Sequence, residues 1–358
     1  MVGVQQHTQY SGDIASALLA YYDRHARDLP WRSPPGTPPP DSYRVWMSEI
    51  MLQQTTVAAV FSYFEKFTER WPDFAALASA DDADVMAAWA GLGYYSRVRN
   101  LIKCARVVVT EYGGELPETS VELAKLPGIG AYTAAAIAAI AFGERVAVVD
   151  ANVERVVARL FAIETPLPAA KPEIRVAVNA ITPADRPGDF AQAMMDLGAS
   201  LCSVRNPQCL ICPLKMHCAA QKAGFAETLP RKAAKKAKPE RTGIAFWIER
   251  DGHVWLIRRP DHGMLGGMRS LPDDGWNARA DGDSLPPFGA DWSPVAGEVV
   301  HVFTHFRLTL RLTATAAPVD ESCLPSGEWW PLKSLDSAGL PTLFSKAAKL
   351  AIRAREKF

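Results

Sequence analysis

The helical part of the chain is organised around the stretch Leu126-Pro-Gly-Ile-Gly-Ala-Tyr-Thr-Ala-Ala-Ala-Ile-Ala-Ala-Ile-Ala-Phe142. Gly128 and Gly130 allow a tight backbone turn just before a run of small apolar residues that predicts a buried helix. Amides that point outward at a helix start form an anion site. A hairpin of this kind between two helices is the helix-hairpin-helix motif, which binds a DNA phosphate without recognising the base sequence. A Gly-x-Gly pair alone is usually only a turn, so the surrounding sequence has to support this interpretation.

The sequence around this stretch predicts two domains of different class. From Gly12 to about Lys222, apolar residues recur every three or four positions, which is typical of an all-α region. Residues 231–241 hold six basic residues, one acidic residue and no large apolar side chain. They indicate a linker, for which we favour a solvated tether over a DNA clamp.

Beyond the linker the hydrophobic period changes to that of strands. Strand-like runs at 244–249 and 253–258 are joined through an Asp-Gly pair that suits a hairpin turn. A second β stretch covers 298–315, and a helix is expected from about Thr342 to Lys357. The C-terminal region is therefore expected to be a small α+β domain.

Composition excludes several classes of protein. The chain has 358 residues, of which 48% are hydrophobic and 22% charged, as expected for a globular protein with more than one domain. Its 39 basic and 39 acidic residues neither require nor exclude a nucleic-acid partner. The mainly apolar run at 131–142 is too short to span a bilayer, and the first residues do not form a signal peptide. We expect no membrane association and an intracellular location, which would be the cytoplasm (nucleoid) in a bacterium.

Four of the six cysteines are clustered near the end of the helical region. Cys202, Cys209, Cys212 and Cys218 fall within 17 residues, a spacing unlike that of a disulfide scaffold. Four thiolates can hold a four-iron four-sulfur cube or a tetrahedral zinc ion. Only one pair has the Cys-x2-Cys spacing, so we favour the cube over zinc. The remaining Cys104 and Cys323 are expected to be ordinary buried thiols.

Two carboxylates are candidates for catalysis. Asp150 stands just before a helical pattern, where it can serve as an N-cap and also remain charged beside a developing cation. Glu49 lies at helical spacing from Val45, Leu52 and Thr56, on a largely apolar stripe. Desolvation there would raise its pKa toward that of a general acid, although a glutamate in this pattern is more often a rim residue.

The motifs occur together in a specific order: Leu29-Pro-Trp-Arg32, Ser48-Glu-Ile-Met-Leu-Gln-Gln-Thr55, Gly91-Leu-Gly-Tyr-Tyr-Ser-Arg97, Leu126-Pro-Gly-Ile-Gly130, Val149-Asp-Ala-Asn152 and the four cysteines. In this combination the chain resembles the MutY adenine DNA glycosylase family. The resemblance implies an all-α helix-hairpin-helix glycosylase domain with an iron–sulfur subdomain over residues 1–225. A basic linker over 226–241 and an α+β MutT/Nudix-like domain over 242–358 would follow. The hairpin would occupy about 120–145 and the cluster loop 202–218.

The resemblance also implies an activity. A member of this family would be a monomeric base-excision repair enzyme with one four-iron four-sulfur cluster. It would hydrolyse the N-glycosidic bond of adenine opposite 8-oxoguanine or guanine in double-stranded DNA. Glu49 would protonate the leaving adenine, Asp150 would stabilise the oxocarbenium-like sugar and steer water, and Tyr132 and Asn152 would support that chemistry.

The family pattern further implies contacts with DNA. The residues expected to bind DNA or probe the lesion are Arg32, Gln54, Thr55, Leu92, Tyr94, Gly128, Gly130, Phe303, Thr304 and His305. The last three lie in a stretch where many members have Phe-Ser-His, and without the resemblance it would be an ordinary strand. The C-terminal domain lacks the acidic Arg-Glu-x-x-Glu-Glu run of a Nudix hydrolase, so we expect it to recognise a base.

Position 132 separates two subclasses of the superfamily. Bifunctional relatives of the endonuclease III type carry there a lysine whose amine forms a Schiff base with the sugar. Tyr132 cannot do this, which predicts a monofunctional enzyme, although the tyrosine could simply pack. Two alternatives stay open: a thymine or oxidised-pyrimidine glycosylase, and a DNA-binding module with a redox-reporting cluster, against which the pair Glu49 and Asp150 argues.

Overall fold

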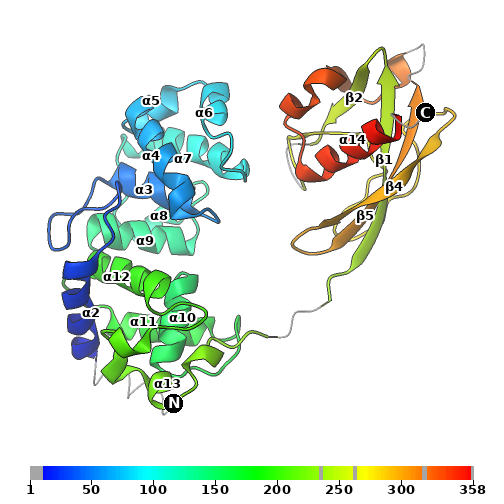
Figure 1. The fold of residues 1–358 in the computed structure, drawn as a ribbon. Coiled ribbons are helices and arrows are strands. Elements are labelled where there is room, and N and C mark those ends of the chain that lie inside the picture. Colours follow the sequence, from blue (N-terminus) through cyan, green and yellow to red (C-terminus); the bar gives the residue numbers. More distant parts are fainter. Residues whose placement is uncertain (1–10, 234–236, 261–263, 317–320, 356–358) are drawn as a thin grey trace. The chain divides into compact units, whose positions relative to one another are not determined.

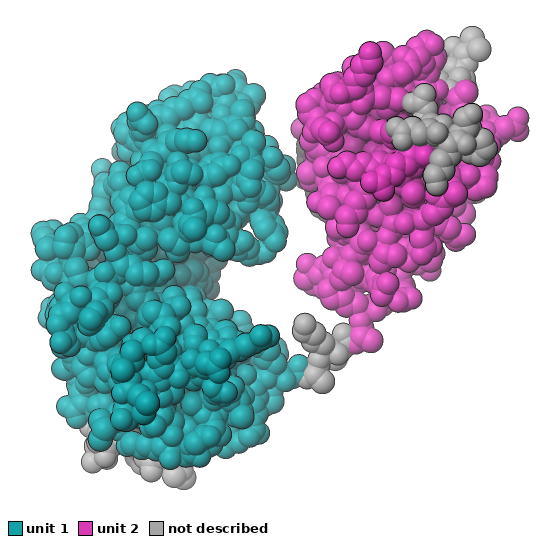
Figure 2. Space-filling view, viewed as in Figure 1, with its two compact units in different colours: residues 1–234 teal, residues 235–358 magenta. Residues whose placement is uncertain are grey.

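The computed structural model describes residues 11–233, 237–260, 264–316 and 321–355. The chain divides into two compact units, residues 1–234 and 235–358 (Figures 1 and 2). The first unit is helical, and the second is built on one mixed sheet with a helix against it. The predicted fold class, an all-α domain followed by an α+β domain, is confirmed.

The first unit follows the predicted helical periodicity closely. Its α-helices are α2 (Ser11–His25), α3 (Ser42–Leu52), α4 (Val57–Arg70), α5 (Phe74–Ser79), α6 (Asp82–Ala88), α7 (Ser96–Tyr112), α8 (Ser120–Leu123), α9 (Ala131–Phe142), α10 (Ala151–Leu160), α11 (Lys171–Ile181), α12 (Pro187–Ser200) and α13 (Ala219–Lys222). Short 3₁₀ turns follow at η1 (Cys209–Ile211), η2 (Lys215–His217) and η3 (Ala226–Thr228). None of the described helices is long and apolar enough to cross a membrane.

Helix α9 lies at the centre of this unit. Every residue from Thr133 to Ile140 is buried, and most of them are alanines. Small side chains let helices α3 and α12 pack closely against it. On α12 the approach is so close that a Cβ at Gly188 would lie 2.6 Å from the Ala139 carbonyl oxygen, so only glycine fits there. Gly143, in the left-handed region at φ 71°, ends the helix.

Polar side chains at helix starts set where the site-bearing helices begin. The carboxylate of Asp41 accepts the amide of Arg44 and caps α3, while the hydroxyl of Thr56 accepts the amide of Ala59 and caps α4. Each cap satisfies an amide that the helix itself leaves unpaired. The start of helix α3, which carries Glu49, is therefore fixed locally by its sequence.

The second unit is a sheet of β1 (Glu240–Arg250), β2 (His253–Arg258), β3 (Arg269–Ser270), β4 (Ser293–Val302), β5 (Arg307–Ala316) and β6 (Gly327–Pro331). The strand order is β3-β2-β1-β5-β4, with β6 also paired to β2. Strands β1 and β5 run parallel, and the other pairs are antiparallel. Helix α14 (Thr342–Arg355) packs against β1, β4 and β5 (Figure 1), and its predicted end at Lys357 lies outside the described residues.

The predicted linker differs from the structure at both ends. The Leu167 amide donates to the Arg231 carbonyl at 2.8 Å, and the Ala233 amide donates to the Leu167 carbonyl at 3.0 Å. At the other end, β1 already begins at Glu240. Composition does not reveal backbone pairing of this kind. The basic composition alone therefore predicted a linker from 226 to 241. Residues 234–236 lie outside the described residues.

The isolated cysteines also differ from each other. Cys104 is buried as expected, but Cys323 is exposed. The expectation for Cys323 was therefore wrong, because it lies in the short 3₁₀ turn η4 (Glu321–Cys323), none of whose residues is buried.

Candidate active site

The first unit contains a cleft of about 690 Å³. It is bordered by α3, the loop before α3, the start of α9, the start of α10 and one face of α12. The four residues predicted to be catalytic all line it: Glu49, Tyr132, Asp150 and Asn152. Arg32, Gln54 and Thr55 line it as well. The fold thus brings together side chains that lie about 100 positions apart in the sequence.

Glu49 is the buried acid of the cleft, with 7% of its surface exposed. Burial raises its pKa to about 7. The charge of Asp150 raises the pKa further, whereas a hydrogen bond from Tyr132 and the charge of Arg32 lower it. The carboxyl group is therefore partly protonated near neutral pH and can donate a proton.

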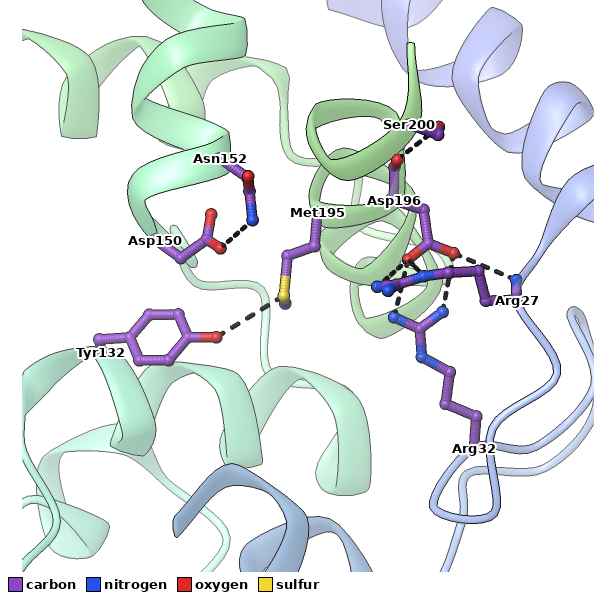
Figure 3. A network of polar contacts seen from close by, with 8 residues as sticks. All are labelled: Arg27, Arg32, Tyr132, Asp150, Asn152, Met195, Asp196 and Ser200. Carbon is purple, nitrogen blue, oxygen red and sulfur yellow. Dashed lines mark hydrogen bonds and ion pairs between the residues drawn. The ribbon is translucent and has the colours of Figure 1, made fainter. Parts of the chain in front are cut away.

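Asp150 is the N-cap of helix α10 (Figure 3). Its Oδ1 accepts the Val153 amide at 2.7 Å, and its Oδ2 accepts the Asn152 side-chain amide at 2.9 Å. The carboxylate therefore has the N-cap position that the sequence predicts, and it also lines the cleft. The two donors hold the anion in one orientation.

Asn152 is itself held by Arg155, a residue that the sequence analysis missed. Arg155 Nη2 donates to Asn152 Oδ1 at 2.8 Å and to the Gly198 carbonyl at 2.6 Å. Its Nε donates to the Cys202 carbonyl at 2.7 Å. Hydrogen bonds therefore run without a break from the Asp150 carboxylate to the backbone of the cysteine loop. The available signal was the i,i+3 spacing of residues 152 and 155 on one helix.

Arg32 lies in the cleft wall and is paired with a carboxylate. Arg32 Nη1 and Nη2 donate to the two oxygens of Asp196 at 2.8 and 3.0 Å, and Arg27 Nε donates to the same group at 2.7 Å (Figure 3). Burial alone would raise the pKa of Asp196, but the two guanidinium groups hold it below its usual value. Sequence gave no sign of this ion pair, whose members are 164 residues apart.

Tyr132 stands at the start of α9 between these groups. Its hydroxyl contacts the Met195 sulfur at 3.6 Å (Figure 3), and its hydrogen bond to Glu49 is part of what sets the pKa of that acid. Burial and the two nearby carboxylates raise the pKa of Tyr132 well above its ordinary value, so the hydroxyl stays protonated.

A second, smaller cleft of about 190 Å³ lies beside the first and is also lined by Gln54. Tyr94 and Gly128 line it from two other segments. All three residues are in the left-handed region, with φ values of 57°, 49° and 77°. Leu92 is buried near the turn that carries Tyr94, and the Thr55 hydroxyl is hydrogen-bonded to Arg97.

The predicted hairpin connects α8 to α9. The Ile129 amide donates to the Leu126 carbonyl at 3.2 Å, and Gly130 is the N-cap residue of α9. A Cβ at Gly128 would lie 2.7 Å from the Cβ of Asn100, so both its conformation and its surroundings require glycine.

The remaining predicted contact residues lie in the second unit. Phe303, Thr304 and His305 form the turn between β4 and β5, closed by a bond from the Phe303 amide to the Phe306 carbonyl at 2.9 Å. The Phe303 ring stacks on Phe306 at 4.7 Å, whereas Thr304 and His305 are exposed. Lys238 Nζ donates to the Phe303 carbonyl at 2.6 Å.

The four clustered cysteines line one common cavity of the first unit. Arg159 Nη1 donates to the Cys202 sulfur at 3.2 Å, and the Cys218 thiol donates to the Arg159 carbonyl at 3.4 Å. Within the described residues, no three His, Cys, Asp or Glu side chains are placed to hold a single metal ion.

Comparison with known proteins identifies both units. The family model described as "HhH-GPD superfamily base excision DNA repair protein" matches residues 47–177, and the model described as "NUDIX domain" matches residues 244–350. The adenine DNA glycosylase of Homo sapiens is 34% identical over 400 residues, covering 93% of this chain and 73% of the human protein. The chain belongs to the adenine DNA glycosylase family. The family member of Mycolicibacterium smegmatis is 41% identical over 225 residues, covering 63% of this chain and 75% of that protein.

Solved structures agree with the fold of the first unit. A thermostable thymine-DNA glycosylase matches with a TM-score of 0.54 and 28% identity, covering 60% of this chain and 98% of that protein. Endonuclease III in a non-covalent DNA complex matches with a TM-score of 0.51 and 23% identity, covering 61% of this chain and 97% of that protein, which shows a shared fold. The family predicted from the motifs is confirmed, and so are the helix-hairpin-helix domain and the Nudix domain.

The pKa of Glu49 predicts how this adenine DNA glycosylase family member responds to pH. The folded protein holds a proton on Glu49 that the unfolded chain releases near pH 4.5, so the contribution of Glu49 to native stability falls as pH rises from about 4.5 to about 7. Glu49→Gln removes this dependence. Relative to wild type, the variant is expected to gain up to about 3 kcal/mol above pH 7, at 1.36 kcal/mol per pKa unit, and little at pH 4.

Urea unfolding of both proteins between pH 4 and 8.5 measures this difference. Glu65→Gln, at an exposed position on α4, is the matched control and should show no such trend. A stability difference that is the same at every pH would contradict the burial of an ionisable Glu49.

Proposed function

We propose that the protein is a monofunctional glycosylase that removes adenine opposite 8-oxoguanine or guanine in double-stranded DNA by hydrolysis. The observation that carries this proposal is the pair of unlike carboxyl groups in one cleft. Glu49 is buried with its pKa raised to about 7, whereas Asp150 is held by two hydrogen-bond donors. Hydrolysis of an N-glycosidic bond needs one group that gives a proton and one that stays anionic.

In this mechanism the adenine leaves the base stack and enters the cleft. Glu49 gives its proton to the departing base as the bond to the sugar breaks. The Asp150 carboxylate, oriented by Asn152 and the Val153 amide, stabilises the positive charge that develops on the sugar and directs the attacking water. The water oxygen bonds to the sugar carbon that the base has left, and the proton that the water loses returns to the Glu49 carboxylate. Tyr132 holds Glu49 by a hydrogen bond and offers no amine for a Schiff base, which supports the monofunctional assignment.

Binding to DNA is assigned to the hairpin and the clefts. The α8–α9 hairpin presents backbone amides to a phosphate, and Gln54 and Tyr94 stand beside the second cleft, where they would probe the opened duplex. The exposed Thr304 and His305 of the second unit would read the base opposite the adenine. A single chain supplies all of these parts, which is why we assign a monomer.

We assign one four-iron four-sulfur cluster to Cys202, Cys209, Cys212 and Cys218. The four thiols line one cavity, and a compact spacing with a single Cys-x2-Cys pair suits a bulky cube better than zinc. Arg159 would offset part of the negative charge of the thiolates. The cluster would supply structural order to the 202–218 loop, and the chemistry at the sugar uses only the residues of the cleft.

The catalytic assignment predicts the behaviour of two isosteric variants. Glu49→Gln cannot donate the proton, and Asp150→Asn has no charge to stabilise the sugar, so each should lose adenine release by at least a hundredfold. Single-turnover assays on duplexes with adenine opposite 8-oxoguanine, followed by alkali, measure the release. The exposed variant Glu65→Gln should act like wild type. A loss below tenfold for Asp150→Asn would leave that residue with its capping role alone.

The lesion assignment predicts a change in preference with no change in chemistry. Thr304→Val and His305→Ala should lower the ratio of rates on 8-oxoguanine and guanine duplexes by roughly tenfold, the value of about 1–3 kcal/mol for a good base contact. Thr315→Val, at the opposite end of β5, is the matched control. If both rates fall together and the ratio holds, the turn has no part in reading the opposite base.

The cluster assignment predicts the metal content of the purified protein. Wild type should contain four iron atoms and four inorganic sulfides per chain, and Cys209→Ser should lose most of both. Cys323→Ser, which changes an exposed thiol outside the cluster loop, should keep them. One zinc ion per chain without sulfide would overturn the assignment.

A further inference from the structure

Arg97, near the start of α7, is a buried charge that the mechanism above does not use. Only 7% of its surface is exposed. Burial lowers its pKa. Within the described part of the chain its hydrogen bonds all go to neutral carbonyl and hydroxyl oxygens. Burying a guanidinium among neutral partners costs free energy, so its contacts need a reason.

The guanidinium of Arg97 joins two segments that are distant in sequence. Nη1 donates to the carbonyls of Ile50 and Met51 at 3.2 and 2.7 Å, at the C-terminal end of α3. Nη2 donates to the Thr55 hydroxyl at 3.0 Å and to the Leu92 carbonyl at 3.1 Å. One rigid group therefore ties the end of the Glu49 helix to the 92–94 turn.

Each of the two segments that it joins carries a non-glycine residue with a positive φ. Gln54, next to Thr55, has φ 57°, and Tyr94, two residues after Leu92, has φ 49°. Residues other than glycine keep such angles only where the surrounding structure enforces them. Arg97 supplies this constraint on both sides, and its guanidinium also lies 5.5 Å from the centre of the Tyr94 ring.

We propose that Arg97 is a positioning residue that fixes the Gln54 and Tyr94 turns relative to the Glu49 helix, so that extrusion of the base delivers it to the acid in one geometry. The inference rests on the proposed function and adds a residue to it. Arg97 acts through Gln54, Tyr94 and α3, and it contacts neither the base nor the sugar. The planar guanidinium group holds several N–H donors in a fixed arrangement, so one side chain can donate hydrogen bonds to both segments. The single ammonium group of a lysine cannot do this.

The experiment compares Arg97→Lys with Thr55→Val, which deletes one acceptor and leaves the buried charge in place. Duplexes carry 2-aminopurine at the target position, so that fluorescence reports extrusion, and a parallel set carries adenine opposite 8-oxoguanine for single-turnover release per active site. We expect Arg97→Lys to slow extrusion and release together by more than tenfold, and Thr55→Val by a few-fold. Thr110→Val, an exposed change on the same helix α7, should match wild type.

The double variant separates positioning from a direct DNA contact of Thr55. If Thr55 acts through Arg97, the double variant should be no slower than Arg97→Lys alone, whereas independent losses would multiply. Wild-type extrusion in both single variants overturns the proposal, as does a multiplicative loss in the double variant. If Arg97→Lys does not fold, the rate and fluorescence of Thr55→Val decide. Failure of wild type to release adenine from any duplex would instead refute the proposed function.

Discussion

The spacing of the active site depends on the side-chain volume of helix α9, which carries neither of the two carboxyl groups. Helix α3 brings Glu49, and helix α12 supports α10, whose first turn holds Asp150. Both α3 and α12 pack on α9. Because α9 is mostly alanine where it is buried, its neighbours can approach it closely. A larger residue in this helix would move Glu49 and Asp150 apart without touching either.

Within that frame, local surroundings place two similar carboxyl groups in different environments. Glu49 meets a largely apolar environment, which disfavours its charge and raises its pKa. Asp150 sits at a helix N-terminus and accepts two hydrogen bonds, which hold its carboxyl group in one orientation. The same two environments were visible in the sequence as an apolar stripe and an N-cap position.

Features set by neighbouring residues were predictable, and features set by distant ones were not. The hairpin before α9, the cap at Asp150 and the helical stripe of Glu49 all depend on contacts within a few positions. The pairing of Arg32 with Asp196 spans 164 residues, and the Arg97 contacts to α3 span more than 40. Only folding brings such partners together, and the residue types alone do not show which distant residues will pair. The predicted linker was too long for the same reason, because residues 231–233 and strand β1 form backbone pairs with residues far away in the chain.

Those pairs have a consequence for how the two units can be recombined. Residues 231–233 complete a pairing with Leu167 in the first unit, and Lys238 secures the Phe303 turn of the second. A chimaera joined at either end of the basic segment would give one partner a foreign strand or deprive the other of its own. The natural exchange point is the stretch between Ala233 and Ala237. Homologous units exchanged there would keep the Leu167 pairing and the Lys238 contact within their own units.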